Sequence, residues 1–220
     1  MQKRWIVFMF LLLLTGSMVY AQDSTSMSDA TVATIRNKQI HDLLDYRFRG
    51  GFYAFERLFL QTVKYTPQAR QYCIIGITVL SFQVSCDGTL HDIKIKNPLH
   101  YGLDEQLTKF IKATKGQWNL CHNNKYTRFS VPIQFTMKGT KTDSIDPVIT
   151  YTGNNPGYVC SSDNYYLQKA KEALAKKKGK RAQDYIEILI KRNPFNNEYY
   201  TMMKQAMDYA QKGKKKKKKK

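Results

Sequence analysis

The chain has 220 residues, a formal net charge of +19, and 42% hydrophobic and 13% aromatic residues. This length suits one or two domains with a hydrophobic core, and the composition excludes a disordered chain, a fibrous protein and a membrane protein with several spans. Seven of the positive charges lie in the C-terminal run Lys214–Lys220, so the rest of the chain is only moderately basic.

The first 21 residues have the pattern of a signal peptide. Lys3 and Arg4 precede the ten apolar residues Trp5–Leu14, and small residues lead to a cleavage position after Ala21. This apolar run is too short to span a membrane, which takes about 20 helical residues. We therefore expect cleavage after Ala21 and a periplasmic protein. The alternative is an uncleaved anchor, Trp5–Tyr20, that holds the chain in the inner membrane facing the periplasm.

Two helices are predicted before the centre of the chain. Residues 22–34 are small and polar, which predicts a flexible segment, and a weak helical pattern follows over Ile35–Tyr46. Gly50 and Gly51 interrupt this pattern. The next stretch, Phe52–Val63, predicts an amphipathic helix because its apolar residues recur at helical spacing. The residues on this face are Phe55, Leu58, Phe59 and Thr62.

A β-hairpin is predicted in the centre of the chain. Residues from Gly76 to Val84 alternate between two faces, as residues of a strand do. The dipeptide Asp87-Gly88 predicts a type I′ turn, which needs positive φ at both central positions. The returning strand continues to Ile95, and its apolar residues change parity between Leu90 and Ile93. This change predicts a β-bulge.

A helix and a last strand complete this unit. Acidic residues follow Leu103, where they favour the start of a helix, and Lys115-Gly116 ends it. Trp118 is expected to cover the end of the core, and Phe129–Met137 alternates regularly enough to predict a strand. The predicted core face of the helix consists of Leu103, Leu107, Phe110, Ile111 and Thr114. The order of helix, strand, strand, helix and strand defines an α+β fold.

Three further segments follow the last strand. Residues 139–162 predict a polar linker, and residues 163–212 predict a helical segment with tetratricopeptide-like spacing. Too few repeats are present for an independent array, so these helices are expected to pack on the sheet domain or to form an appendage for a partner. The poly-Lys tail, residues 213–220, is predicted not to fold; it either contacts anionic membrane surfaces or is merely solvated.

An ordered set of motifs runs through residues 50–138. It consists of Gly50-Gly51-Phe52, Tyr65, Ala69, the alternating run from Gly76 to Val84, Asp87-Gly88, Leu103-Asp104, Trp118 and Val131-Pro132-Ile133-x-Phe135. In this order the motifs resemble the TonB C-terminal domain family, in the variety of Bacteroidetes-type bacteria. The chain departs from the family at Thr66, which separates Tyr65 from Pro67, and before the last strand, where the usual glycine-rich segment is absent.

The resemblance implies a three-stranded antiparallel-type sheet of order 2-1-3 packed by two helices, and the order of the elements favours the same sheet. The last strand then lies on an edge, where Pro132 is tolerated because it has no N–H to donate. In the family this edge pairs with a short peptide of an outer-membrane receptor, by β-augmentation. The implied peptide-binding residues are Arg128, Ser130, Gln134 and Thr136. The alternative is an edge that Pro132 and nearby cations protect from any pairing.

The four cysteines all follow the predicted signal peptide. In an oxidising compartment they favour two disulfides, for which three connectivities exist; the alternative is four buried thiols. With the sheet order above, Cys73 and Cys86 lie at opposite ends of one extended run, so they cannot pair. Cys86 lies near the entrance of the last strand and Cys73 near its exit. We therefore predict the pairs Cys86–Cys121 and Cys73–Cys160.

No motif for catalysis, a cofactor or a metal is present, and the four histidines lack ligand spacing. We predict no enzymatic activity, no cofactor and no metal. The predicted function is a periplasmic module that captures peptides or strands of envelope and outer-membrane transport proteins by edge-strand addition. One alternative is a short, anchored TonB-type energy transducer for outer-membrane receptors. Another is a structural envelope protein tethered to anionic surfaces through Lys214–Lys220.

The expected partners are segments of outer-membrane receptors or of other envelope proteins. A second copy of the chain, bound as a strand-paired homodimer, is an alternative partner, and so is an anionic membrane surface at Lys214–Lys220. Nucleic acid is not expected to be a partner, because an exported protein rarely meets it.

Overall fold

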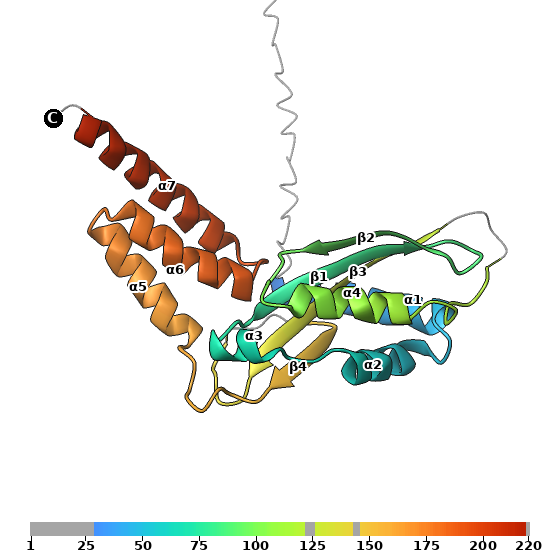
Figure 1. The fold of residues 1–220 in the computed structure, drawn as a ribbon. Coiled ribbons are helices and arrows are strands. Elements are labelled where there is room, and N and C mark those ends of the chain that lie inside the picture. Colours follow the sequence, from blue (N-terminus) through green and yellow to red (C-terminus); the bar gives the residue numbers. More distant parts are fainter. Residues whose placement is uncertain (1–28, 122–125, 143–145, 219–220) are drawn as a thin grey trace, which may run out of the picture.

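The computed structural model describes residues 29–121, 126–142 and 146–218, and within these residues it contains seven helices and four strands (Figure 1). In chain order they are α1 (Asp29–Arg47), α2 (Gly51–Thr62), α3 (Pro67–Gln71), β1 (Gly76–Val84), β2 (Leu90–Lys96), α4 (Leu103–Ala113), β3 (Thr127–Met137), β4 (Ile149–Gly153), α5 (Asp163–Ala175), α6 (Gly179–Arg192) and α7 (Asn197–Lys218). The predicted signal peptide lies outside the described residues.

The strands form one mixed sheet in the order β2-β1-β3-β4. β1 pairs antiparallel with β2 and with β3, so the predicted order 2-1-3 is present within the sheet. β4 pairs in parallel with the other side of β3, although the sequence pattern predicts only a linker there. The segment Ile149–Gly153 nevertheless carries a strand signal, because β-branched and aromatic residues alternate with threonine along it.

The main core lies between one face of the sheet and helices α2 and α4. Phe55 and Phe59 of α2 both contact Phe110 of α4 edge to face, with ring centroids 5.0 and 5.2 Å apart. Trp118, only 3% exposed, covers the end of this core as predicted. The strand residues that point into the core are Leu80, Phe82 and Val84 of β1 with Phe129, Val131, Ile133, Phe135 and Met137 of β3.

Two helices are longer than the sequence pattern predicts. α1 begins at Asp29, so residues 29–34 of the segment that we expect to be flexible are helical. Its buried residues share one face at spacings of three and four, which explains the extension. α7 continues to Lys218, so most of the predicted tail is helical. Lysine has a good helix propensity, and cations are favourable near a helix C-terminus.

The turn between β1 and β2 is not the predicted type I′ turn. Gly88 has φ +81°, but Asp87 is not among the residues with positive φ. The loop is longer, because the Ser85 N–H donates to the Thr89 carbonyl at 2.9 Å and the Gly88 N–H donates to the Ser85 carbonyl at 3.0 Å. The Asp87 carboxylate accepts the Thr89 N–H at 2.8 Å, so a side chain within the turn also stabilises its backbone.

Helices α5, α6 and α7 form a second unit with a separate core. Figure 1 shows this unit extending from one end of the sheet domain. It contacts that domain at the start of β1, where the Asn97 side chain donates to the Lys191 carbonyl at 3.1 Å. Its core residues are Ala170, Ala173, Leu174, Ala182, Ile186, Leu189, Tyr199, Met202 and Ala206. The helices are therefore an appendage that is docked on the sheet domain.

We expect Gly179→Ala to destabilise this unit, although alanine is normally the better helix former. A Cβ at Gly179 would lie 2.3 Å from the backbone nitrogen of Ala210 and 2.5 Å from the carbonyl oxygen of Ala206, both in α7. Separating the two helices should cost roughly 1 to 3 kcal/mol. Guanidinium unfolding followed by circular dichroism measures this cost. The control is Lys180→Ala at the exposed neighbouring position, and an equal effect of both changes would refute the close-packing argument.

Candidate protein-binding site

The predicted peptide-binding strand, β3, lies inside the sheet. Its outer side is paired with β4 over five residue pairs, from Ile133 opposite Ile149 to Met137 opposite Gly153. Gln134 is opposite Thr150 and Thr136 is opposite Thr152, so the prediction of an open edge at Gln134 and Thr136 is wrong. The physical reason is non-local: the outer backbone groups of β3 are satisfied by a strand that begins twelve residues after β3 ends.

The first half of β3 extends beyond β4 but is not exposed as a regular edge. The Pro132 carbonyl accepts the Val148 N–H at 3.0 Å, so Pro132 faces outward, and strand alternation places the backbone of Ser130 and Arg128 on the same side. The buried side chain of Arg47 in α1 donates to the Thr127 hydroxyl at 2.5 Å. α1 therefore lies against the start of β3, and a helix beside a strand is one way in which proteins cover an edge.

The four predicted residues differ in exposure. Gln134 is 5% exposed, Ser130 and Thr136 are half-buried, and Arg128 is exposed. The Ser130 hydroxyl lies 3.5 Å from the hydroxyl of Ser81 on β1. The four residues share one face of β3 and follow one another along it.

Arg128 belongs to a small polar group on the solvent face of the sheet. It is opposite Gln83 of β1, whose side chain donates to Asp92 of β2 at 3.2 Å. Asp92 also forms an ion pair with Lys94 at 2.5 Å. The hydrogen bond and charge of Lys94, with the charge of Arg128, lower the pKa of Asp92. Arg128 thus takes part in an internal charge network, which gives its side chain a role besides contact with a partner.

Both disulfides join the predicted pairs. Cys73 is bonded to Cys160, and Cys86 is bonded to Cys121. The first bond connects the segment before β1 to the segment after β4, and Cys160 is buried against the sulfur of Met137 at 3.5 Å. The second connects the end of β1 to the segment before β3, which fixes the turn end of the sheet.

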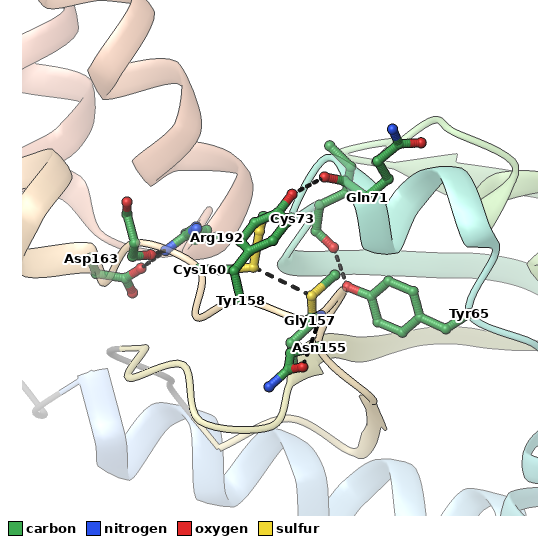
Figure 2. The surroundings of a disulfide bond; sticks show 12 residues. Tyr65, Gln71, Cys73, Asn155, Gly157, Tyr158, Cys160, Asp163 and Arg192 are labelled. Atoms are coloured by element: carbon green, nitrogen blue, oxygen red, sulfur yellow. Dashed lines mark hydrogen bonds and ion pairs between the residues drawn. A yellow bond between two sulfur atoms is a disulfide. The ribbon is translucent and has the colours of Figure 1, made fainter.

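Further contacts secure the segment between β4 and Cys160 (Figure 2). The Tyr158 hydroxyl donates to the Gln71 carbonyl, and the Gly157 N–H donates to the Asn155 side chain at 3.1 Å. Gly153, the last residue of β4, is so close to the ring of Tyr65 that an added Cβ would lie 2.6 Å from it. Burial raises the pKa of Tyr65 well above its usual range, which keeps its hydroxyl protonated as a donor to the Ile74 carbonyl. β4 is therefore held at its end by packing and by the disulfide.

Within the described residues, no group of three or more His, Cys, Asp or Glu side chains is arranged to hold a metal ion. Of the helices in the described residues, none combines the length and apolar character that crossing a membrane requires.

The fold and these contacts define a small α+β domain with a four-stranded mixed sheet and a helical appendage. Residues 61–137, about a third of the chain, match the model of the Gram-negative bacterial TonB protein C-terminal. This stretch is thus similar to a TonB C-terminal domain, as the motifs indicate. Comparisons with curated proteins and with solved structures found no match.

The match extends from the end of α2 to the end of β3, so β4 and the helices α5 to α7 follow it in the chain. Domains of this family are non-enzymatic protein-interaction domains, and the similarity of residues 61–137 indicates a TonB-like protein-interaction module of the cell envelope. The strand that covers β3 is therefore an addition from outside the matched region.

Proposed function

We propose that this protein is an exported, periplasmic module that captures extended segments of outer-membrane transport proteins by adding them to its sheet. The observation that carries the proposal is the pairing of β4 with β3. In this pairing an extended segment lies parallel to β3 over five residue pairs, which supports strand addition on this side of the domain. The segment in this position belongs to the chain itself, so we place the partner on the outer side of β4.

The outer side of β4 suits this role. β4 is the last strand of the sheet on this side, and the side chains of Thr150 and Thr152 are exposed. Between them, Tyr151 turns to the core, with its ring centroid 6.0 Å from that of Phe135. This alternation leaves one apolar anchor inside and two small polar side chains outside, so a further strand can approach the backbone. The two disulfides agree with an oxidising, exported location.

A photo-crosslinking residue at Thr152 tests the proposal in intact cells. We expect adducts with the periplasmic N-terminal segments of outer-membrane receptors, identified by mass spectrometry. Gln134 is unsuitable as a probe position because it is only 5% exposed. The control is the same residue at Lys204, an exposed position on α7. Intact-mass measurement of the purified protein tests cleavage after Ala21 separately.

Two outcomes would contradict the proposal. Adducts only between two copies of the chain would show that β4 mediates a strand-paired homodimer. Equal adducts from Thr152 and Lys204 would show that the sheet edge has no preference for a receptor segment.

A further inference from the structure

A groove lies between β2 and the end of α4, at the end of the sheet domain opposite to the helical unit. It encloses about 830 Å³, which is within the range of about 300 to 1,000 Å³ that is typical of ligand sites. The β1–β2 turn forms one wall, and the residues that follow α4 form another. Figure 1 shows the turn and the end of α4 at the same end of the sheet. This groove is on the β2 side, whereas the proposed receptor contact is on the opposite edge at β4.

The inner surface of the groove is apolar. Leu90 and Ile93 of β2 line it with Trp118 and Leu120. Leu120 is 72% exposed and Ile93 is 38% exposed, although Trp118 beside them is buried. The exposed residues are thus continuous with the hydrophobic core, and contact with an apolar side chain of a partner would remove them from water.

The rim of the groove is positively charged. Arg49, Lys112 and Lys115 line it, and all three side chains are exposed. Among the residues that the structure describes, none of the three forms an ion pair. The one acidic residue of the lining, Asp87, accepts the Thr89 N–H, and this hydrogen bond lowers its pKa. The groove is therefore lined by three cations and one carboxylate, and that carboxylate is already hydrogen-bonded within the turn.

β2 supplies an unpaired strand beside the groove. It is the end strand of the sheet, and no other described strand pairs with its outer side. The predicted bulge is present, because the register shifts between Ser81 and Gln83 and Asp92 has φ +51°. The bulge limits regular pairing to short stretches such as the one near Leu90. An extended chain in the groove can thus contact β2 without forming a long ladder.

The geometry points to a second binding surface: this groove binds an extended peptide with an apolar side chain beside Leu120 and Trp118 and acidic residues on either side of it. The cations provide the charge complementarity for such a peptide. A second copy of the chain is disfavoured, since its own groove presents the same cations and the whole chain carries +19. A membrane surface is disfavoured because the apolar residues line a recess between walls and do not form a protruding face.

The test uses the full mature chain and two short fluorescent peptides, one alternating leucine with glutamate and one alternating leucine with lysine. Fluorescence anisotropy should show binding of the glutamate peptide alone. The double variant Lys112→Glu/Lys115→Glu should weaken this binding by roughly tenfold or more. The matched control, Lys109→Glu/Lys204→Glu, makes the same charge change at exposed positions outside the groove, so it should have a much smaller effect. Leu120→Glu should also weaken binding, because it removes the apolar contact with the leucine side chains of the peptide.

Several results would overturn this inference. They are equal binding of both peptides, equal effects of the two double variants, or competition by phosphatidylglycerol vesicles that removes all peptide binding. A dimer that dissociates in Lys112→Glu/Lys115→Glu would show that the groove joins two copies. The proposed function stands or fails separately, because its adducts form at Thr152 on the other edge and are measured in cells without the peptide.

Discussion

Replacing Arg192 with methionine is expected to lower the free energy of unfolding by roughly 3 to 5 kcal/mol. Arg192 forms an ion pair with Asp163 at 2.7 Å, and the two side chains are only 2% and 3% exposed. The same guanidinium nitrogen donates to the Ser161 carbonyl at 2.9 Å, and the guanidinium stacks on Tyr166 at 4.8 Å. Without Arg192, the Asp163 carboxylate stays buried but loses this partner, which is the costly way of breaking a buried pair.

Chemical unfolding of the full chain, followed by the helical circular dichroism signal, measures this loss. The matched control is Lys191→Met at the neighbouring position, where an exposed ion pair with Glu187 at 3.7 Å should contribute less than about 1 kcal/mol. The double variant Arg192→Met/Asp163→Asn should recover part of the stability, because the buried charge is removed with its partner. Similar losses for Arg192→Met and Lys191→Met would refute the importance of the buried pair.

The sequence predicts the α+β core well because one face of each strand is buried. Residues such as Leu80 and Val131 alternate with polar neighbours, and this pattern determines both strand identity and the face that meets the helices. The helix α3 was also within reach of sequence reasoning. Thr66 accepts the Ala69 N–H at 3.1 Å and Pro67 is the first helical residue, which is a recognised helix start.

The candidate site is harder to predict, because the exposure of its side chains and the pairing of its strand edges depend on contacts between distant segments. Gln134 has the correct parity for the face away from the core but is only 5% exposed, and its backbone is paired with β4, whose own pattern spans only five residues. The β2 groove combines Arg49, Lys112 and Leu120. These residues come from three separate segments, and no local spacing connects them. Local periodicity therefore predicts the strands, whereas the occupancy of an edge requires the three-dimensional structure.

The double variant Cys73→Ala/Cys160→Ala is expected to be destabilised and to release β4 from β3. The bond closes a loop with a sequence separation of 87 residues, for which the chain-entropy relation gives about 4 to 5 kcal/mol. Because Cys160 follows β4 in the chain, its loss should also raise amide hydrogen exchange selectively at Ile149–Gly153. Guanidinium unfolding and hydrogen exchange by mass spectrometry measure the two effects.

The matched control is Cys86→Ala/Cys121→Ala, which removes the bond at the turn end of the sheet. Its sequence separation of 35 residues gives a slightly smaller global loss of about 4 kcal/mol. It lies at the opposite end of β1 from Cys73, so β4 should remain protected relative to the rest of the sheet. Equal exchange at Ile149–Gly153 in the two variants would show that the Cys73–Cys160 bond does not hold β4 in place. Selective exchange in Cys73→Ala/Cys160→Ala would instead mean that this bond controls whether the outer side of β3 is occupied by the chain's own strand.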